Sequence, residues 1–496
     1  MSRFSQTWFA LSVLLALLAC GSASSQIAIK HSAVKYIAPD STDLEEYSHK
    51  HFWRATGEVF GFNMALWSFD RFIQKGDFAY INLHTIKENF RVGFKWDNDK
   101  LGTNTFLHPY NGNLYFNAGR SNGFSFWGSS LYAIGGSAMW ELFMEREYPS
   151  TNDIIATPIG GTAIGEVLFR ASDAVLDDRT HGHERFEREL ACFIISPIRG
   201  LNRIFTGQAW RRRSTPGRIF GTPLLGMRLS AGYKMMAFQG RMKHMGYGGC
   251  LQIDLEYGDR FEVKSTKTYD YFTVRGELQV IKGQPMLNRL SIQGRLLARE
   301  FLEKRKSWAS VGLYQHFDFY DSDTIKSLDK VPFKLGIPAS VGVGFLFRDR
   351  PNRKIRFDAF AHVNGVILGS VLSDHYRADE RNYNWASGFS VKAGMNFVHG
   401  KKWSLSVSNE YYRLFSWVGY RYGVHPETSD YRKLNVQGDH STAFFNVTTA
   451  RFDYQLHKHL YASAEFSNYV RSTHYRDFPH VLSSTMALRL MCSYKF

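Results

Sequence analysis

The stretch MALRLMCSYKF, residues 486–496, decides the fold of the C-terminal half because its residues alternate in polarity. In an extended strand, successive side chains point to opposite faces. One face would carry Met486, Leu488, Leu490, Cys492, Tyr494 and Phe496, and the other would carry Ala487, Arg489, Met491, Ser493 and Lys495. One apolar face and one charged face are typical of a strand in a transmembrane β-barrel, which meets lipid outside and water inside.

The same alternation recurs upstream as far as residue 220, for example at 225–234 and 355–364. The alternating segments begin near Leu225, Gly249, Tyr271, Arg289, Trp308, Phe333, Lys354, Tyr383, Trp403, Phe444, Leu460 and Leu482. They predict a mainly β fold: an antiparallel transmembrane barrel of about twelve strands over 220–496. Segments of about 9–11 residues favour a barrel over a soluble β-sandwich, whose strands average nearer about 5–6 residues.

The breaks between these segments alternate in length. Tight breaks fall around 349–353, 400 and 457–459, and long breaks fall around 322–330, 374–381, 416–440 and 471–480. Barrels have short periplasmic turns and longer outer loops, and an even strand number places both barrel ends in the periplasm. Phe496 resembles the terminal aromatic residue that the barrel-insertion machinery recognises, so this machinery is an expected partner.

The composition agrees with an outer-membrane location. Aromatic residues make up 16% of the chain and the mean hydropathy is −0.30. Membrane-spanning helices would each need about 20 largely apolar residues, whereas aromatic girdles suit a barrel. The net charge of +16 is dispersed and no nucleic-acid motif accompanies it, so we expect no nucleic-acid partner. Outer-membrane lipid and lipopolysaccharide are expected partners, and solvated loop charge is an equal explanation.

Residues 1–25 have the pattern of a signal peptide. Arg3 provides the positive start, residues 9–19 are apolar, and small residues follow. The apolar run is too short to span a bilayer. The stretch LLACG, residues 17–21, also resembles a lipobox in which Cys20 would be lipidated. Ordinary cleavage is favoured because a barrel needs no lipid anchor.

Cysteine and histidine spacing predicts no metal and no cofactor. Cys192, Cys250 and Cys492 are far apart in the mature chain and form no metal-binding pattern. The stretch HGHE at 181–184 lies in a charged run at 177–189, and we do not expect it to bind metal. No phosphate-binding loop, nucleophile elbow or zinc-protease motif is present.

Residues 26–215 are predicted to form a helical domain that begins with an amphipathic helix at 51–74. The domain contains, in order, HPY at 108–110, YFNAGRSNG at 115–123, GSAMWE at 136–141, PSTND at 149–153, GG at 160–161 and GE at 165–166. These segments resemble the bacterial domain of unknown function numbered 3943, over residues 85–190. Gly119 stands where the family pattern has alanine, which is a small-for-small change. The resemblance implies no assigned activity.

Several polar residues of this domain share helix faces. Ser137, Glu141 and Glu145 are spaced i, i+4 and i+8, so one continuous helix would present them together. We expect these acidic groups to point at a common partner, Arg120 or Arg170.

The next helix also has a recognisable pattern. Ser150 and Asp153 resemble a capping box that opens it, and Thr157, Gly161 and Gly165 give it a small-residue face suited to close helix packing.

The candidate catalytic residues are His108, Ser137, Glu141 and Asp153. Of these, His108, Ser137 and Asp153 could supply a base, a nucleophile and an orienting group. Glu141, with Glu145, could act as an acid or base or bind a cation. A surrounding polar network would consist of Tyr110, Arg120, Glu145, Glu166 and Arg170. The structural alternative is a buried polar network that fixes the helices, with Ser150 and Asp153 acting as caps. The sequence favours this structural alternative.

Two hypotheses of function follow from these patterns. The first is a plugged outer-membrane channel, or a structural envelope protein, in which the helical domain fills the lumen or closes its periplasmic mouth. The second is an envelope enzyme that modifies lipid or lipopolysaccharide through His108 with Ser137 or Glu141. An enzyme should place His108 within hydrogen-bond reach of Ser137 or of a glutamate.

Overall fold

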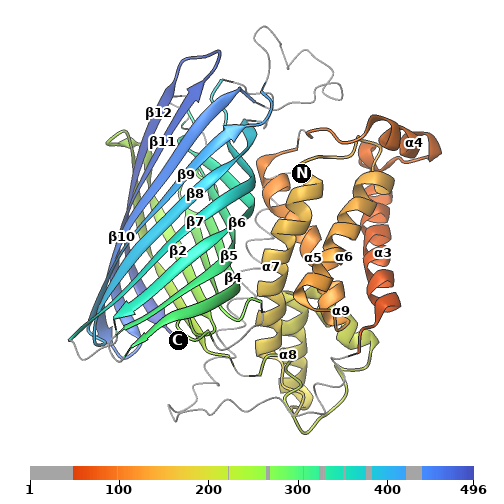
Figure 1. Cartoon of the computed structure of the whole chain (residues 1–496), viewed down its shortest axis with the longest axis horizontal. Helices are drawn as coiled ribbons and strands as arrows, with labels where there is room; N and C mark the ends of the chain where they lie inside the picture. The colour runs from red at the N-terminus through yellow and green to blue at the C-terminus, as the bar shows by residue number, and fades with distance from the viewer. Residues whose placement is uncertain are drawn as a thin grey trace. The chain divides into compact units, whose positions relative to one another are not determined.

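The computed structural model describes residues 49–496 except 98, 222, 264–267, 305–306, 323–324, 326–327, 329, 350–353, 376–381 and 420–437. The predicted signal peptide and Cys20 lie outside the described residues. The chain divides into two compact units (Figure 1). The helical unit ends at Pro223, and the barrel unit begins at Leu224 and also takes in Asn98–Leu101.

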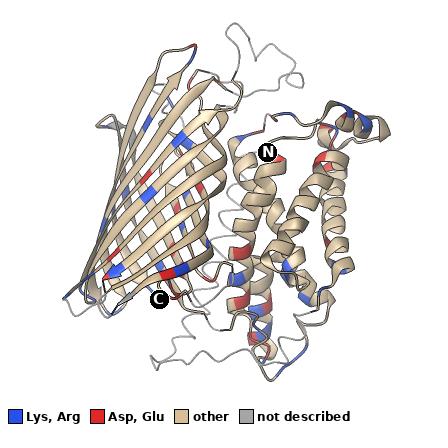
Figure 2. Ribbon diagram, viewed as in Figure 1, with Lys and Arg blue, Asp and Glu red and all other residues tan. Residues whose placement is uncertain are grey.

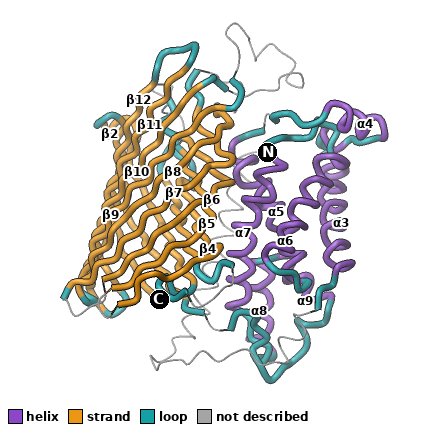
Figure 3. Tube along the Cα trace, viewed as in Figure 1, coloured by secondary structure: helices purple, strands orange, loops and turns teal. Residues whose placement is uncertain are grey.

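The helical unit is built from α-helices and short π- and 3-10 helices (Figure 3). Its elements are α3 (Phe52–Ser68), η1 (Phe69–Gln74), η2 (Asp77–Ala79), α4 (Leu83–Val92), η3 (Thr103–Leu107), α5 (His108–Ser121), α6 (Phe126–Met139), η4 (Trp140–Met144), α7 (Asp153–Val175), α8 (Gly182–Ile195) and α9 (Pro197–Phe205). The predicted helix at 51–74 is confirmed as α3, with the π-helical η1 completing it.

Helices α5 and α7 touch through their backbones (Figure 1). A Cβ atom on Gly112 would lie 1.8 Å from the carbonyl oxygen of Thr157, and a Cβ atom on Gly161 would lie 2.6 Å from the Cα atom of Gly112. Further along, a Cβ atom on Gly165 would lie 2.7 Å from the Phe116 ring. Only glycine permits so close an approach. The predicted small-residue face of α7 is therefore confirmed, and the order of contacts shows that α5 and α7 run parallel.

Among the described helices, α7 is long and apolar enough to cross a membrane by length and composition. Helix α7 has 23 residues and continues to Val175. The apolar window is 72% buried within the protein, which is what the core helix of a soluble unit also shows. Length alone therefore does not make α7 a membrane span.

A small apolar cluster holds α8 against the end of α7. It consists of Val175, Leu176, Cys192 and Ile195. The Cys192 thiol is fully buried, and this burial raises its pKa to about 11. The thiolate is the reactive form of cysteine, so both burial and the raised pKa protect this side chain.

In a variant whose other cysteines are serines, we therefore expect native Cys192 to resist maleimide labelling at pH 8, where about one thiol in a thousand is ionised. Mass spectrometry of the labelled protein measures this directly, and the same sample unfolded in denaturant should label fully. Rapid labelling of the folded protein would contradict the packing of α8 on α7.

Within the described residues, the barrel unit has twelve antiparallel strands that close on themselves (Figures 1 and 3). They are β1 (Leu225–Phe238), β2 (Arg241–Tyr257), β3 (Phe272–Val280), β4 (Leu287–Lys304), β5 (Ser307–Asp321), β6 (Lys334–Asp349), β7 (Ile355–Leu372), β8 (Tyr383–His399), β9 (Trp403–Ser416), β10 (Ser441–His457), β11 (Leu460–Tyr475) and β12 (Val481–Lys495). Strand β1 pairs with β12 from Arg228 opposite Lys495 to Phe238 opposite Thr485. The predicted fold class is confirmed.

The strands are longer than predicted. The 9-residue β3 fits the predicted length of about 9–11 residues, but the other strands have 14 to 18 residues. Side-chain polarity alternates only along the part of a strand that faces the apolar layer, whereas hydrogen bonding between strands continues past that layer. The turns after β8 and β10 are short. At the same end of the barrel, the connection between β2 and β3, residues 258–271, is longer than these turns.

The two faces of β12 differ as predicted. On the outer face, Leu488, Leu490 and Tyr494 are exposed, whereas Arg489 and Ser493 on the inner face are fully buried. Charged residues are set along the barrel strands (Figure 2). The barrel therefore has an apolar outer surface on this strand and a polar interior, as the alternation predicts.

Candidate functional site

Three predicted site residues lie at the ends of helices in the helical unit. His108 is the first residue of α5 and follows the π-helical η3, and Glu141 lies in the π-helical η4. Asp153 is the first residue of α7. Glu141 and Asp153 are buried and His108 is largely buried. π-Helical turns are frequent at functional sites because they redirect a side chain that an α-helix would place elsewhere.

His108, Glu141 and Asp153 come together. Each contributes one ring nitrogen or carboxylate oxygen to a group whose atoms all lie within 4.8 Å of one another. The Nε2 atom of His108 lies 3.6 Å from Oδ2 of Asp153, which is longer than a hydrogen bond. An arrangement of one imidazole and two carboxylates can exchange protons or bind a cation.

Hydrogen bonds from the protein hold the two carboxylates. Oε2 of Glu141 accepts the backbone N–H of Ser150 at 2.7 Å, and Oδ1 of Asp153 accepts the Asn152 side-chain amide at 2.9 Å. The Ser150 hydroxyl accepts the backbone N–H of Asp153 at 3.1 Å. This is one half of the predicted capping box. Glu141 replaces Asp153 as the acceptor for the Ser150 N–H, which links η4 to the start of α7.

The electrostatics of Glu141 are unfavourable for a charged carboxylate. Burial raises the pKa of Glu141 well above its usual range, and the negative charges of Glu145 and Asp153 raise it further. His108 and the Ser150 N–H offset only part of this shift. The site therefore favours either a proton on Glu141 or a positive charge nearby.

The predicted pairing of Ser137 with His108 is not observed. In the part of the chain that the structure describes, the Ser137 hydroxyl donates to the backbone carbonyl of Asp153 at 3.4 Å. Glu145 also leaves the predicted common face, because the helix ends at Met144 and Glu145 is extended. Its side chain instead accepts the indole N–H of Trp140. The i, i+4, i+8 prediction was wrong at Glu145 since it assumed a continuous α-helix.

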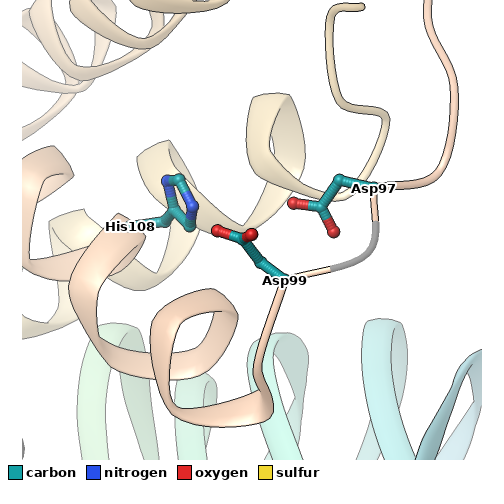
Figure 4. Close-up of side chains that lie close together, drawn as sticks. All are labelled: Asp97, Asp99 and His108. Carbon is teal, nitrogen blue, oxygen red and sulfur yellow. The ribbon is translucent and has the colours of Figure 1, made fainter. Parts of the chain in front are cut away.

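Asp97 lies beside the site and was missed by the sequence analysis. Figure 4 shows its carboxylate turned toward His108, and one of its oxygens lies within 4.8 Å of a His108 ring nitrogen. Asn104 donates to Asp97 at 2.9 Å, and the Asp97 N–H donates to Asn152 at 3.1 Å. An isolated aspartate outside any helical pattern carries no signal in a single sequence.

Arg120 and Arg170 bind Glu166 rather than Glu141 or Glu145. Oε2 of Glu166 lies 2.8 Å from Nε of Arg120, and Oε1 lies 2.8 Å from Nε of Arg170. Arg120 also donates to the Phe124 carbonyl at 2.8 Å. Tyr110, the remaining predicted network residue, follows His108 on α5, and burial raises its pKa. Arg120, Arg170 and Glu166 of the predicted network therefore form an ion-paired group of their own, separate from the group that contains His108.

A second polar site lies in the lumen of the barrel. Arg289 of β4 forms an ion pair with Glu410 of β9, and Glu410 also accepts the Tyr320 hydroxyl at 2.8 Å. The four strands β5 to β8 separate β4 from β9 along the shorter way around the barrel. This ion pair therefore crosses the lumen rather than following its wall.

Further ion pairs join the two ends of the sheet. Lys234 of β1 and Arg489 of β12 both contact Glu277 of β3, the latter at 2.8 Å. Arg275 of β3 contacts Glu465 of β11 at 2.6 Å. The sequence predicted the inward face of Arg489, but pairing between distant strands depends on barrel closure and cannot be read from alternation.

An aromatic layer lies toward the end with the long loops. The Phe333 ring stacks on Tyr469 with centroids 4.7 Å apart, and Phe445 packs 5.5 Å from Phe333. Arg471 of β11 donates to the carbonyl of Pro332 at 3.2 Å, which fixes the residues before β6 against the barrel wall.

The connection between β2 and β3 packs against inward residues at the opposite end. The Phe261 ring lies 5.0 Å from Trp308 and 3.3 Å from the Arg348 guanidinium carbon. Arg295 of β4 pairs with Asp270 at 2.7 Å and donates to the Glu262 carbonyl at 2.8 Å. Segments of the barrel unit itself therefore occupy its interior near both ends.

Residues 93–198 match the family model described as "Domain of unknown function (DUF3943)", which confirms the resemblance found in the sequence. Among curated proteins, none matches the chain.

The barrel is similar to solved structures that each cover 55% of this chain. A NanC porin is 6% identical, with a TM-score of 0.27 and 100% of its own chain covered. The CymD monoaromatic hydrocarbon channel is 10% identical, with a TM-score of 0.23 and 87% covered. The outer membrane channel DcaP of Acinetobacter baumannii is 10% identical, with a TM-score of 0.22 and 97% covered.

Proposed function

We propose that this chain is an outer-membrane protein whose barrel is a gated channel for a small polar solute, closed at rest by its own side chains. The apolar outer row of β12 supports a lipid environment, and the charged inner row supports a polar path. The observation that carries the proposal is the Arg289–Glu410 ion pair, which spans the lumen between strands that are not neighbours.

The chemistry of the lumen favours a gate over a permanent filling. Buried ion pairs contribute little net stability compared with apolar side chains of similar volume. A lumen selected only for stability would be expected to contain apolar residues throughout. Here apolar packing is concentrated around Phe333 and Tyr469, whereas Arg489, Glu277 and Glu465 form a charged layer. Water and a polar solute could replace protein partners along this charged layer once the aromatic layer moves.

The lumen-filling groups described above all belong to the barrel unit, so the helical unit is not required as a plug. Its predicted role in closing the lumen or the periplasmic mouth stays a prediction. The enzymatic alternative is weakened because the Ser137 hydroxyl donates to the Asp153 carbonyl instead of to His108. The remaining enzymatic candidates are His108, Glu141 and Asp153. Lipid and lipopolysaccharide mass spectrometry of cells with and without the protein tests that alternative.

The test of the channel is single-channel conductance in planar bilayers. We expect the wild-type protein to show no steady current. A variant with Arg289→Ala, Glu410→Ala and Phe333→Ala removes both the cross-lumen ion pair and the central aromatic ring, and it should conduct with discrete steps at least ten-fold above the wild-type baseline.

The control variant is Asn364→Ala with Ser390→Ala. These side chains face one another on neighbouring strands, with the Asn364 amide nitrogen 3.0 Å from the Ser390 hydroxyl oxygen, so they line the wall without crossing the lumen. The control should remain closed. Heat-modifiable migration on gels verifies that each barrel is folded. A folded triple variant that stays silent would reject the channel, and a wild-type protein with a large steady current would reject the closed state.

A further inference from the structure

We propose that His108, Glu141 and Asp153 bind a divalent transition-metal ion in the helical unit. This inference goes beyond the proposed channel and does not depend on it, because all three residues belong to the helical unit. The spacing of cysteines and histidines in the sequence gave no sign of such a site. Its ligands come from three separate helical segments, and no short motif joins them.

The distances suit a shared ion. Metal–nitrogen and metal–oxygen bonds of about 2.0–2.1 Å in a tetrahedral site place neighbouring ligand atoms about 3.3 Å apart. His108 Nε2 and Asp153 Oδ2 are 3.6 Å apart, and a Glu141 oxygen lies within 4.8 Å of a ring nitrogen of His108 and of a carboxylate oxygen of Asp153. Side-chain movements of up to about 1.5 Å would bring all three ligand atoms to this separation. The 3.6 Å between His108 Nε2 and Asp153 Oδ2 is too long for a direct hydrogen bond.

The carboxylates are oriented as metal ligands commonly are. In known sites, hydrogen bonds from surrounding groups fix the first ligands in position. The Ser150 N–H binds Oε2 of Glu141, and the Asn152 amide binds Oδ1 of Asp153. Each interaction uses one oxygen of its carboxylate. The second oxygen of Asp153 is the one that faces His108.

Charge balance gives an independent reason for a cation. Three other buried carboxylates of the helical unit have arginine partners: Glu166 pairs with Arg120 and Arg170, Asp173 with Arg199, and Asp178 with Arg203. Among the described residues, neither Glu141 nor Asp153 forms an ion pair with lysine or arginine. Two buried carboxylates beside one imidazole leave negative charge that a bound metal ion would neutralise.

A buried hydroxyl next to the site supports the same conclusion. Thr157 lies one turn after Asp153 on the same face of α7, and its side chain is 3% exposed. Its Oγ1 atom has no hydrogen-bond partner among the described residues. The helical turn of α7 that contains Thr157 faces Gly112 of α5, and Gly112 lies one turn after His108. In the proposed site this hydroxyl would bind a water molecule on the metal, which would satisfy an otherwise costly polar atom.

The histidine indicates which ions would bind. Imidazole suits zinc, iron, copper and nickel, whereas calcium and magnesium prefer oxygen ligands alone. One imidazole with two carboxylates therefore favours a transition metal such as Zn²⁺ over Mg²⁺ or Ca²⁺. The three residues leave room for a water ligand at a four-coordinate ion, which is the arrangement of reactive zinc sites.

The experiment measures metal bound to the full-length protein, without an affinity tag, in detergent. The protein is stripped with a chelator, dialysed against Zn²⁺, Mn²⁺, Mg²⁺ or Ca²⁺, and analysed by elemental mass spectrometry. We expect one equivalent of Zn²⁺ per chain and a higher melting temperature of the helical signal. Glu141→Gln with Asp153→Asn should weaken Zn²⁺ binding at least 100-fold, and His108→Gln alone should weaken it at least ten-fold.

The control is His183→Gln with Glu184→Gln, which removes an exposed histidine and an exposed carboxylate from α8 and should leave binding unchanged. Circular dichroism of the metal-free proteins shows whether each variant is folded. Should the double variant fail to fold, His108→Gln and the Co²⁺ absorption spectrum of the wild-type protein decide the question. The proposal is rejected if the wild-type protein binds no stoichiometric Zn²⁺, if the folded variants retain it, or if Mg²⁺ or Ca²⁺ binds more tightly.

Discussion

Replacing Glu166 with glutamine should lower the free energy of unfolding of the helical unit by about 3–5 kcal/mol. The Glu166 carboxylate is fully buried and receives both Arg120 and Arg170. Both guanidinium groups are largely buried, and each also lies over an aromatic ring. The substitution keeps the shape of the side chain but removes its charge, so two buried cations lose their counter-charge. Urea unfolding of the full-length protein, followed by circular dichroism at 222 nm, measures the change.

The control is Glu184→Gln. Glu184 pairs with Arg188 at 2.8 Å with the same i, i+4 spacing as the Glu166–Arg170 pair, but the Glu184 side chain is 52% exposed. An exposed pair of this kind contributes about 0.3–0.5 kcal/mol, so the control should change little. Similar losses in the two variants would show that the Glu166 carboxylate is not held in a buried network.

Replacing Gly112 with alanine should destabilise the helical unit by about 3 kcal/mol or more. The new Cβ atom would lie 1.8 Å from the Thr157 carbonyl oxygen and 3.2 Å from the Cα atom of Gly161. Both neighbours are backbone atoms, so no side-chain rotation relieves the overlap and α5 must move away from α7. The separation would also disturb His108, which lies one turn earlier on α5. The same unfolding experiment measures the loss.

Gly135→Ala provides the matched control because Gly135 lies inside α6 and a Cβ atom there would meet nothing within 4 Å. Alanine has the higher helix propensity, so this variant should gain up to about 1 kcal/mol. The opposite signs separate steric contact from helix propensity. A neutral Gly112→Ala variant would be incompatible with the backbone contact between α5 and α7.

The barrel could be predicted in some detail because alternation of polarity reports directly on the two faces of a strand. Most predicted strand starts fall within three residues of the observed ones, and Gly249 is the clear exception because β2 begins at Arg241. There the turn at Gln239 and Gly240 is too short to appear as a break. Strand ends were less predictable, since pairing beyond the apolar band leaves no trace in the polarity pattern.

The candidate site could be predicted only in part. His108, Glu141 and Asp153 stood out as polar residues within the family-like segments, and the structure brings them together. The π-helical turns η3 and η4 could not be foreseen from α-helical spacing, and they change which residues share a face. Ser137 looked like a nucleophile by type, but its hydroxyl is used by a backbone carbonyl. Residue type was therefore informative, whereas register within the helix was not.

The ion pairs that join β3 to β11 and β12 bear on how the protein inserts into the membrane. Glu277 and Arg275 are synthesised early, but the residues that neutralise them, Arg489 and Glu465, arrive on the last two strands. A partly assembled sheet that has taken up only the first hairpins would hold these charges without their counterparts beside lipid. Half-barrels should therefore be short-lived, and completion of the wall and neutralisation of its interior should occur in one concerted step.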